Sequence, residues 1–221
     1  MDWQAIGLTV RLAASTTAIL FLIGVPLAYW LATSRRRWRY IVDALVALPL
    51  VLPPTVVGFY LLVATGPRSP FGRLYEQATG ALLPFSYEGI LLGSVIFNLP
   101  FAVRPFAAAF AAVDRRLIEA SWCLGESRFI TFFRITFRTA WPGVLAGLVL
   151  AFAHTVGEFG VVLMLGGNIP GETRTVSIAI YDSVQALKFQ EANATALLLL
   201  GFSFLVLCIT YSLQHRKAFP L

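Results

Sequence analysis

The stretch LTVRLAASTTAILFLIGVPLAYWLATSRRRWR, residues 8–39, carries a strong signal for the fold class of this chain. Its first part, Leu8 to Ala32, is apolar except for Arg11 and a few small polar residues, and a cluster of arginines follows directly. An apolar run of this length crosses the about 30 Å hydrocarbon core of a bilayer as an α-helix. The stretch therefore predicts a membrane-spanning helix. A cleaved signal peptide is the alternative, but the run is longer than such an apolar region and only Arg11 precedes its core.

Four further apolar stretches, each of roughly 22 to 25 residues, follow along the chain. They cover Tyr40 to Val63, Ile90 to Val113, Pro142 to Leu165 and Ala192 to Leu213. A soluble bundle rich in apolar residues is the alternative, but soluble helices of this length keep one polar face toward water. The composition, 58% hydrophobic and 13% charged residues, favours lipid surroundings. We predict an all-α, polytopic membrane helical bundle of five helices, in a single domain over residues 1–221.

The distribution of Lys and Arg predicts which side of the membrane each connection faces. Eleven of the 17 basic residues lie in one set of connections, and only four lie in the other set. Basic residues are enriched in cytoplasmic connections, so the richer set marks the cytoplasm and puts the N-terminus outside and the C-terminus inside. This role explains the net charge of +6 without a nucleic-acid partner. The richer set consists of Arg35, Arg36, Arg37, Arg39, Arg115, Arg116, Arg128, Arg134, Arg138, Arg216 and Lys217.

The longest predicted cytoplasmic connection, residues 114–141, reads DRRLIEASWCLGESRFITFFRITFRTAW. Its apolar and charged residues are interleaved as in two short amphipathic helices, with Gly125 at the bend between them. Such a hairpin buries one face against the bundle or against a partner. A simple connector at the membrane interface is the alternative.

The hairpin resembles the EAA loop of ATP-binding-cassette importer permeases. The resemblance rests on Glu119-Ala120-Ser121, on Gly125 four residues later, on Ile135 and on Pro142-Gly143. Ser121 replaces the second alanine of the family pattern, and Phe137-Arg138 replaces the usual Leu-Pro, so the resemblance does not define a helix boundary near Arg138. The resemblance implies that the segment docks in a groove of a cytoplasmic ATPase. The coupling residues would be Glu119, Ala120, Ser121, Leu124 and Gly125.

Two longer segments indicate a smaller group within the importer permeases. LPLVLPPTVVGFYLL (48–62) and GEFGVVLMLGGNIPGETRT (157–175) are similar to the molybdate permeases of the ModB family. Sulfate permeases are similar around the EFG and NIPG parts of the second segment. The resemblance implies the permease subunit of a type I importer for tetrahedral oxyanions. Molybdate is the first expected substrate, tungstate the second and sulfate the third.

This resemblance also implies partners and a location. A homodimer of this chain would associate with two copies of a cytoplasmic ATPase, which uses ATP and Mg²⁺, and with a periplasmic or extracellular oxyanion-binding protein. The chain would lie among lipids in the cytoplasmic (inner) membrane of a prokaryote. We expect no cofactor, no metal and no catalytic residue in this chain. A partial phosphate-loop pattern at Gly166 to Thr173 carries Glu172 where the lysine belongs, so nucleotide binding is not expected.

Prolines and glycines within the spans are the candidates for the translocation path or its gate. Pro49, Pro53 and Pro54 each remove a backbone donor, so a kinked or broken helix is expected there. Broken backbone at that depth is tolerated only against protein or a water-filled path. A static kink filled by neighbouring side chains is the alternative. Gly157 and Gly160 in the fourth stretch permit close approach of another helix.

Two ionisable residues lie within the predicted spans. Glu158 is expected to pair with His154, one turn away, or with Arg104, and so to steady a gate. Arg104 either attracts the anion or extends toward the lipid headgroups.

The segment from Gly166 to Gln190 is predicted to be an external loop. Contact with the binding protein or the outer mouth is one role for it, and an ordinary connector is the other. The other external loop, residues 66–86, is expected to carry a short helix, and a sixth span formed by re-entry of the external loop is left open. The candidate contact residues are Asn168, Thr173, Arg174 and Thr175.

Two rival functions remain at this point: an ATP-independent channel or carrier, and a membrane scaffold without a substrate. Only Glu158 is an acid deep within a span, which argues against proton coupling through a chain of acids. Cys123 and Cys208 are expected at different depths, so no disulfide is predicted.

Overall fold

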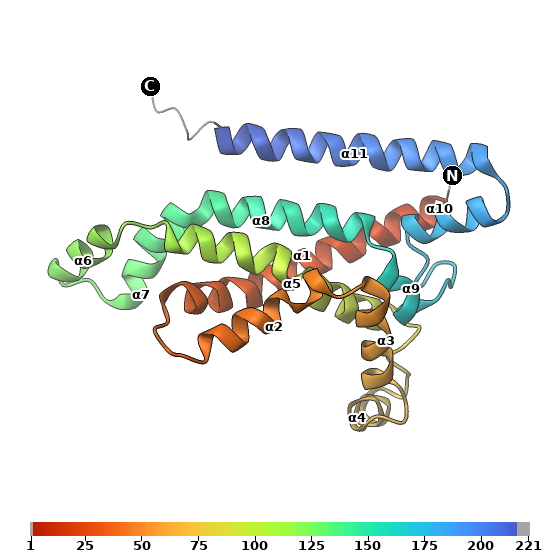
Figure 1. The fold of residues 1–221 in the computed structure, drawn as a ribbon, viewed down its shortest axis with the longest axis horizontal. Helices are drawn as coiled ribbons and strands as arrows, with labels where there is room; N and C mark the ends of the chain where they lie inside the picture. The colour runs from red at the N-terminus through yellow and green to blue at the C-terminus, as the bar shows by residue number, and fades with distance from the viewer. Residues whose placement is uncertain (1, 216–221) are drawn as a thin grey trace.

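The computed structural model describes residues 2–215, and these fold into helices joined by connections that carry no strand (Figure 1). The all-α prediction is confirmed. Arg216 and Lys217, which belong to the basic set, lie outside the described residues. The helices are α1 (Trp3–Thr33), α2 (Arg39–Val51), α3 (Pro54–Thr65), α4 (Pro70–Thr79), α5 (Tyr87–Ala111), α6 (Arg115–Cys123), α7 (Arg128–Thr131), the π-helix η1 (Phe132–Phe137), α8 (Arg138–Gly157), α9 (Gly160–Gly166), α10 (Val176–Gln185) and α11 (Phe189–His215).

Within residues 2–215, four segments are long and apolar enough to cross a membrane, and a fifth is added if α2 and α3 count as one span. The four are α1, α5, the combined segment Arg128–Gly157 and the Phe189–Cys208 part of α11. The prediction of about five spans is therefore confirmed, and the described residues offer no sixth. The predicted fourth span was wrong in its bounds, because the helix starts before Pro142 and ends at Gly157, with the remainder in α9.

α1 begins and α11 finishes at opposite ends of the bundle, and the hairpin formed by α6 and α7 lies at the end where α11 finishes (Figure 1). This arrangement is what an odd number of spans requires. Which end faces the cytoplasm stays a prediction from the basic residues.

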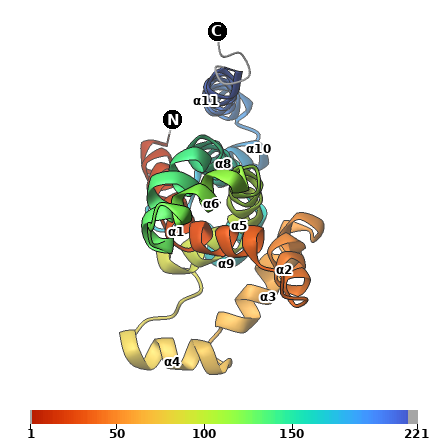
Figure 2. The same cartoon turned by 90° about the vertical axis from the view of Figure 1, so that its left-hand side faces the viewer.

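The centre of the bundle is the mutual packing of α1, α5 and α8 (Figure 2). Phe106 of α5 is fully buried there. Its ring lies against two glycines: a Cβ added at Gly24 would lie 3.3 Å from Phe106 Cε2, and one added at Gly147 would lie 2.7 Å from Phe106 Cε1. Without Cβ atoms the three helices approach closely around one ring.

α3 and α9 form a second close contact beside this centre. A Cβ added at Gly58 would lie 2.7 Å from Met164 Cβ and 3.2 Å from the backbone Cα of Val161. α9 also packs on α5, where Gly93 accommodates the side chains of Leu165 and Val161. The short helix α9 is thus wedged between α3 and α5.

α4 and α11 lie at the periphery. α4 confirms the short helix predicted in residues 66–86; Ser69 caps its start by accepting from Gly72 N at 2.8 Å, and Gly80 ends it in the left-handed region. Its axis runs across the spans rather than along them (Figures 1 and 2). Within residues 2–215, the stronger contacts of α11 are with α10 and α8. The exposed apolar residues of α11 include Leu197, Leu198, Leu200, Phe204 and Leu205.

Gly58→Ala tests the α3–α9 contact. The added methyl group meets Met164 Cβ and the α9 backbone, so we expect a loss of about 1 to 3 kcal/mol in the free energy of unfolding. In a thermal melt of the detergent-solubilised protein this corresponds to about 2 to 4 °C for each kcal/mol.

Gly7→Ala is the matched control, because a Cβ at Gly7 meets nothing within 4 Å. It should leave the melting temperature unchanged or raise it slightly, since alanine favours a helix. Equal melting temperatures for the two variants would contradict the close contact at Gly58.

Candidate functional site

Two helix breaks from different spans meet in one pocket. The first separates α2 from α3 with a bend of 115°, and the second separates α8 from α9. The pocket between them has a volume of about 600 Å³. It brings together residues of α3, α5, α8 and α9 that lie far apart in the sequence. Its lining is formed by Pro54, Thr55, Phe97, Ala153, His154, Gly157, Glu158, Phe159 and Gly160.

The break between α2 and α3 follows from the proline pair. Leu52 is extended, and Pro54 is the first residue of α3, where its missing N–H needs no partner. The predicted break in this span is therefore confirmed. Pro49 behaves differently, since α2 continues through it and its side chain is buried outside the pocket lining.

The break between α8 and α9 brings Gly160 against the first break. Glu158 is extended at the end of α8, and α9 starts at Gly160. A Cβ added at Gly160 would lie 2.7 Å from Pro54 Cβ, so a residue with a side chain would push the two breaks apart. Gly160 thus has the predicted close approach. Gly157 does not have it within this chain, because a Cβ there meets nothing within 4 Å.

Asn98, on α5, stands between the two ionisable residues of the pocket. Its Nδ2 donates to Glu158 Oε2 at 2.9 Å, and its Oδ1 lies 2.8 Å from His154 Nδ1. The His154 ring stacks on Phe101 with ring centroids 3.7 Å apart. The predicted direct pairing of Glu158 with His154 was wrong, because Asn98 separates the two side chains and joins them.

The predicted alternative, a pairing of Glu158 with Arg104, was also wrong. Arg104 faces Asp43 of α2 at 4.0 Å, and both side chains are about half exposed. Arg104 is absent from the pocket lining, so it offers no cation to an anion there.

Asn98 was not among the site residues predicted from the sequence. An asparagine inside the apolar stretch 90–113 was the available signal, because a polar residue within a span normally faces the bundle interior or a cavity.

The pocket is chemically suited to gating rather than to tight anion binding. Its lining, as the described residues define it, includes no lysine or arginine and holds one carboxylate, which repels an oxyanion when ionised. Most of the other lining groups are apolar or lack a side chain beyond Cβ. A weakly binding path lets an ion leave as readily as it enters.

The connection after α5 forms the predicted hairpin. Asp114 caps α6 by accepting from Arg116 N at 2.8 Å, and Gly125 turns the chain with φ of 83°. A residue with a side chain is strained at this angle, so glycine is favoured. The buried Ser121 hydroxyl lies 2.9 Å from Thr131 Oγ1 and ties the two arms together.

The other predicted coupling residues lie on the outside of the hairpin. Glu119 is exposed and pairs with Arg115 at 2.8 Å, and Ala120 and Gly125 are exposed too. Leu124 is 84% exposed at the tip, so the described residues leave most of this large apolar side chain uncovered. The exposed face thus combines charge with apolar surface, as a protein docking site does.

The second arm of the hairpin is not a separate short helix. α7, η1 and α8 form one continuous helical segment, Arg128–Gly157, and no boundary occurs at Arg138. The absence of a proline at Arg138 explains this, since a proline would have removed a backbone donor. The π-helical stretch Phe132–Phe137 carries a cluster of aromatic rings, in which Phe132 packs against Tyr29 with centroids 4.8 Å apart.

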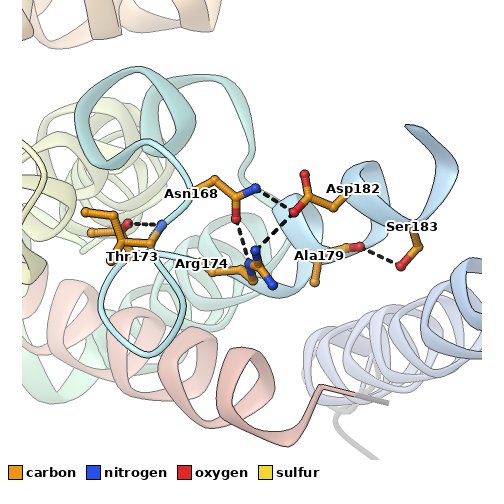
Figure 3. Close-up of polar contacts among 7 residues, drawn as sticks. Asn168, Thr173, Arg174, Ala179, Asp182 and Ser183 are labelled. Carbon is orange, nitrogen blue, oxygen red and sulfur yellow. Dashed lines mark hydrogen bonds and ion pairs between the residues drawn. The ribbon is translucent and has the colours of Figure 1, made fainter. Parts of the chain in front are cut away.

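The predicted external loop holds its polar residues in internal contacts (Figure 3). Arg174 Nε donates to Asn168 Oδ1 at 2.6 Å, Arg174 also pairs with Asp182 at 3.3 Å, and Asn168 Nδ2 donates to Asp182. Thr173 is buried and donates to Gly166 O at 2.6 Å, and Thr175 is buried as well. Asn168 and Arg174 are therefore the more accessible candidates for a partner, and a contact by any of the four stays a prediction.

Cys123 and Cys208 are both free, as predicted.

Comparison with known proteins identifies the family. The pattern of the family described as the binding-protein-dependent transport system inner membrane component matches residues 24–218. The chain belongs to this family. It is a membrane permease subunit of the ATP-binding-cassette importer type and no enzyme, since its relatives are permease components.

The relatives of this permease include two that it matches along nearly the full length. It is 48% identical to the molybdenum transport system permease protein ModB of Azotobacter vinelandii, over 98% of this chain and 96% of that protein. It is 36% identical to the protein of the same name from Escherichia coli K12, over 96% of this chain and 92% of that protein. A probable sulfate transport system permease of Prototheca wickerhamii is 28% identical over 95% of this chain and 82% of that protein.

Solved structures show the same fold. A chain of a bacterial alginate ABC transporter in complex with its alginate-bound periplasmic protein superposes with a TM-score of 0.77 at 18% identity, covering 96% of this chain and 78% of that one. An inward-facing methionine ABC transporter superposes with a TM-score of 0.72 at 15% identity, covering 98% and 95%. The permease thus has the helical architecture of importer permeases.

Thr131→Val tests the bond that closes the hairpin. The variant leaves the buried Ser121 hydroxyl without its partner, at a local cost of about 1 to 3 kcal/mol. We expect faster amide hydrogen exchange in α6 and at the Leu124-Gly125 turn, measured by mass spectrometry on the protein in nanodiscs.

Thr33→Val is the control, since the exposed Thr33 hydroxyl donates to the Tyr29 carbonyl of its own helix and, among the described residues, makes no hydrogen bond to the hairpin. Its hairpin should exchange as the unaltered protein does. An unchanged exchange rate in Thr131→Val would show that the Ser121–Thr131 bond does not hold the hairpin.

Proposed function

We propose that this chain forms the translocation path of an ATP-driven importer that carries a tetrahedral oxyanion, molybdate, across the cytoplasmic membrane. The single observation that carries the proposal is the continuity of Arg128–Gly157. One end of this segment is an arm of the exposed hairpin, and the other end is the break that lines the pocket. A partner that moves the hairpin therefore moves one wall of the pocket.

Two groups of relatives support an oxyanion as substrate. The proteins that match with 48% and 36% identity carry the name of molybdenum transport, and the sulfate relative matches with 28%. Molybdate, tungstate and sulfate are all tetrahedral dianions, and the identities rank molybdate above sulfate. The pocket has no lysine or arginine among its described lining residues, which supports selection among the anions by an external binding protein.

The proposed assembly is a homodimer of this chain with two copies of an ABC ATPase on the hairpin side and a binding protein on the other side. ATP and Mg²⁺ would be used by the ATPase. The exposed apolar residues of the hairpin, Leu117, Trp122, Leu124 and Phe129, support a protein partner there, because in a membrane-external segment such surface otherwise meets water.

An ATP-independent channel or carrier is the second candidate. It gives no role to an exposed hairpin tied closed by the Ser121–Thr131 bond. A scaffold without a substrate gives no role to the pocket between the two breaks. The importer accounts for both features.

Glu119→Lys and Gly125→Arg test the coupling. The first reverses an exposed charge and the Arg115 ion pair, and the second puts a side chain at φ of 83°. Each should lower ATP-dependent molybdate uptake by about tenfold or more, the size of a typical coupling between two sites. The measurement is uptake into proteoliposomes that contain the permease, its ATPase and the binding protein, normalised to inserted protein.

Glu76→Lys on α4 is the control, since it reverses an exposed charge on a helix far from the hairpin in the fold. It should transport normally. Normal uptake by both hairpin variants would exclude the coupling role, and uptake without ATP in the unaltered protein would favour the channel.

The substrate is tested in the same proteoliposomes by competition. Unlabelled tungstate should compete with labelled molybdate more strongly than sulfate does, in the order of their affinities for the isolated binding protein. A competition order that departs from those affinities would place selectivity in the permease instead.

A further inference from the structure

Asn98 uses every hydrogen-bonding group of its carboxamide inside the bundle. It is fully buried on α5. Its Nδ2 donates to Ser94 O at 2.9 Å and to Glu158 Oε2 at 2.9 Å, while its Oδ1 lies 2.8 Å from His154 Nδ1. Because Oδ1 only accepts, Nδ1 of the imidazole is the donor in this bond.

These bonds hold the last turn of α8 and the first residue of the break that follows it. His154 lies in the last turn of α8, and Glu158 is the extended residue that ends it. Asn98 contacts both from a third element, α5. The break itself is connected to the other break, because Gly160 lies against Pro54. A displacement of α8 relative to α5 must therefore break bonds of Asn98 or carry Asn98 along.

We propose that Asn98 is the positioning residue of the gate formed by the two helix breaks. It ties the break between α8 and α9 to α5 and thereby holds the pocket in one conformation. This inference rests on the proposed function and identifies the hydrogen bonds of Asn98 as the contact that resists or transmits movement of the hairpin. Asn98 does not line the pocket, so it acts through Glu158 and His154 rather than on the transported ion.

A lone buried amide is the right chemistry for this role. A carboxylate at this position would repel Glu158, and an apolar residue would leave Glu158 and His154 without a partner in the membrane interior, where unpaired polar groups are costly. Asparagine supplies a donor to the acid and an acceptor to the imidazole at the same time.

The donor and acceptor directions provide a sharp test. Asn98→Asp keeps the acceptor for His154 but places an oxygen against Glu158 Oε2, so two acceptors face each other. Combining it with Glu158→Gln supplies a new donor and restores the bond in the reverse direction. Glu158→Gln alone completes the cycle as a reference. The double variant also carries one carboxylate in the pair, as the unaltered protein does.

The experiment measures molybdate uptake and ATP hydrolysis in the complete reconstituted importer for all three variants, each normalised to inserted protein. Asn98→Asp should reduce uptake by about tenfold and raise the ATP hydrolysed for each ion carried, because a broken buried bond of this kind is worth about one decade in an equilibrium. The double variant should take up molybdate at least about three times faster than Asn98→Asp does. It should also hydrolyse less ATP for each ion carried than Asn98→Asp does.

Thr16→Val is the control for burial alone, since Thr16 is buried on α1, away from the pocket lining. It should leave uptake and ATP cost unchanged. Normal uptake by Asn98→Asp, or a double variant no better than Asn98→Asp, would overturn the proposal. If the unaltered importer carries no molybdate, the proposed function itself is contradicted. This result is distinguishable from the two outcomes above, because both of them require transport by the unaltered importer.

Discussion

The need to pair every backbone hydrogen-bonding group inside the membrane shapes this protein more than any other interaction. Every peptide group at that depth must be paired, so a helix can be interrupted only where other protein or a water-filled space covers the break. This chain interrupts one span between α2 and α3, ends another at Gly157, and sets the two breaks against each other. Gly160 at one break touches Pro54 at the other, and α9 is wedged between α3 and α5. The pocket is a consequence of this pairing.

The second important feature is the uninterrupted helical segment Arg128–Gly157. A helix transmits displacement along its axis because its hydrogen bonds make it stiff, whereas a loop absorbs displacement. The π-helical stretch in its path widens the helix locally without ending it, and its aromatic rings pack against α1 and α5. The hairpin, this segment and the break at Glu158 therefore form one mechanical unit within the chain.

Much of the fold was predictable because the signals were local. Runs of apolar residues predicted the spans, Gly125 predicted the bend of the hairpin, and the pair Pro53-Pro54 predicted a break, since each depends on properties of a few neighbouring residues. The bounds of the fourth span were not predictable in this way. Its apolar stretch continues through Glu158 and Phe159 into α9, so composition alone shows no interruption there.

The order of the amino acids alone showed that this is a helical membrane protein, where its hairpin lies and which family it resembles. It did not determine which residues meet. Glu158 and His154 are four residues apart, yet Asn98 from another helix separates them, and Arg104 binds Asp43 instead. The tertiary structure decided these partners because helices bring residues together through their packing angles and glycine contacts. Those depend on all the helices at once, whereas hydropathy and turn signals are properties of single segments.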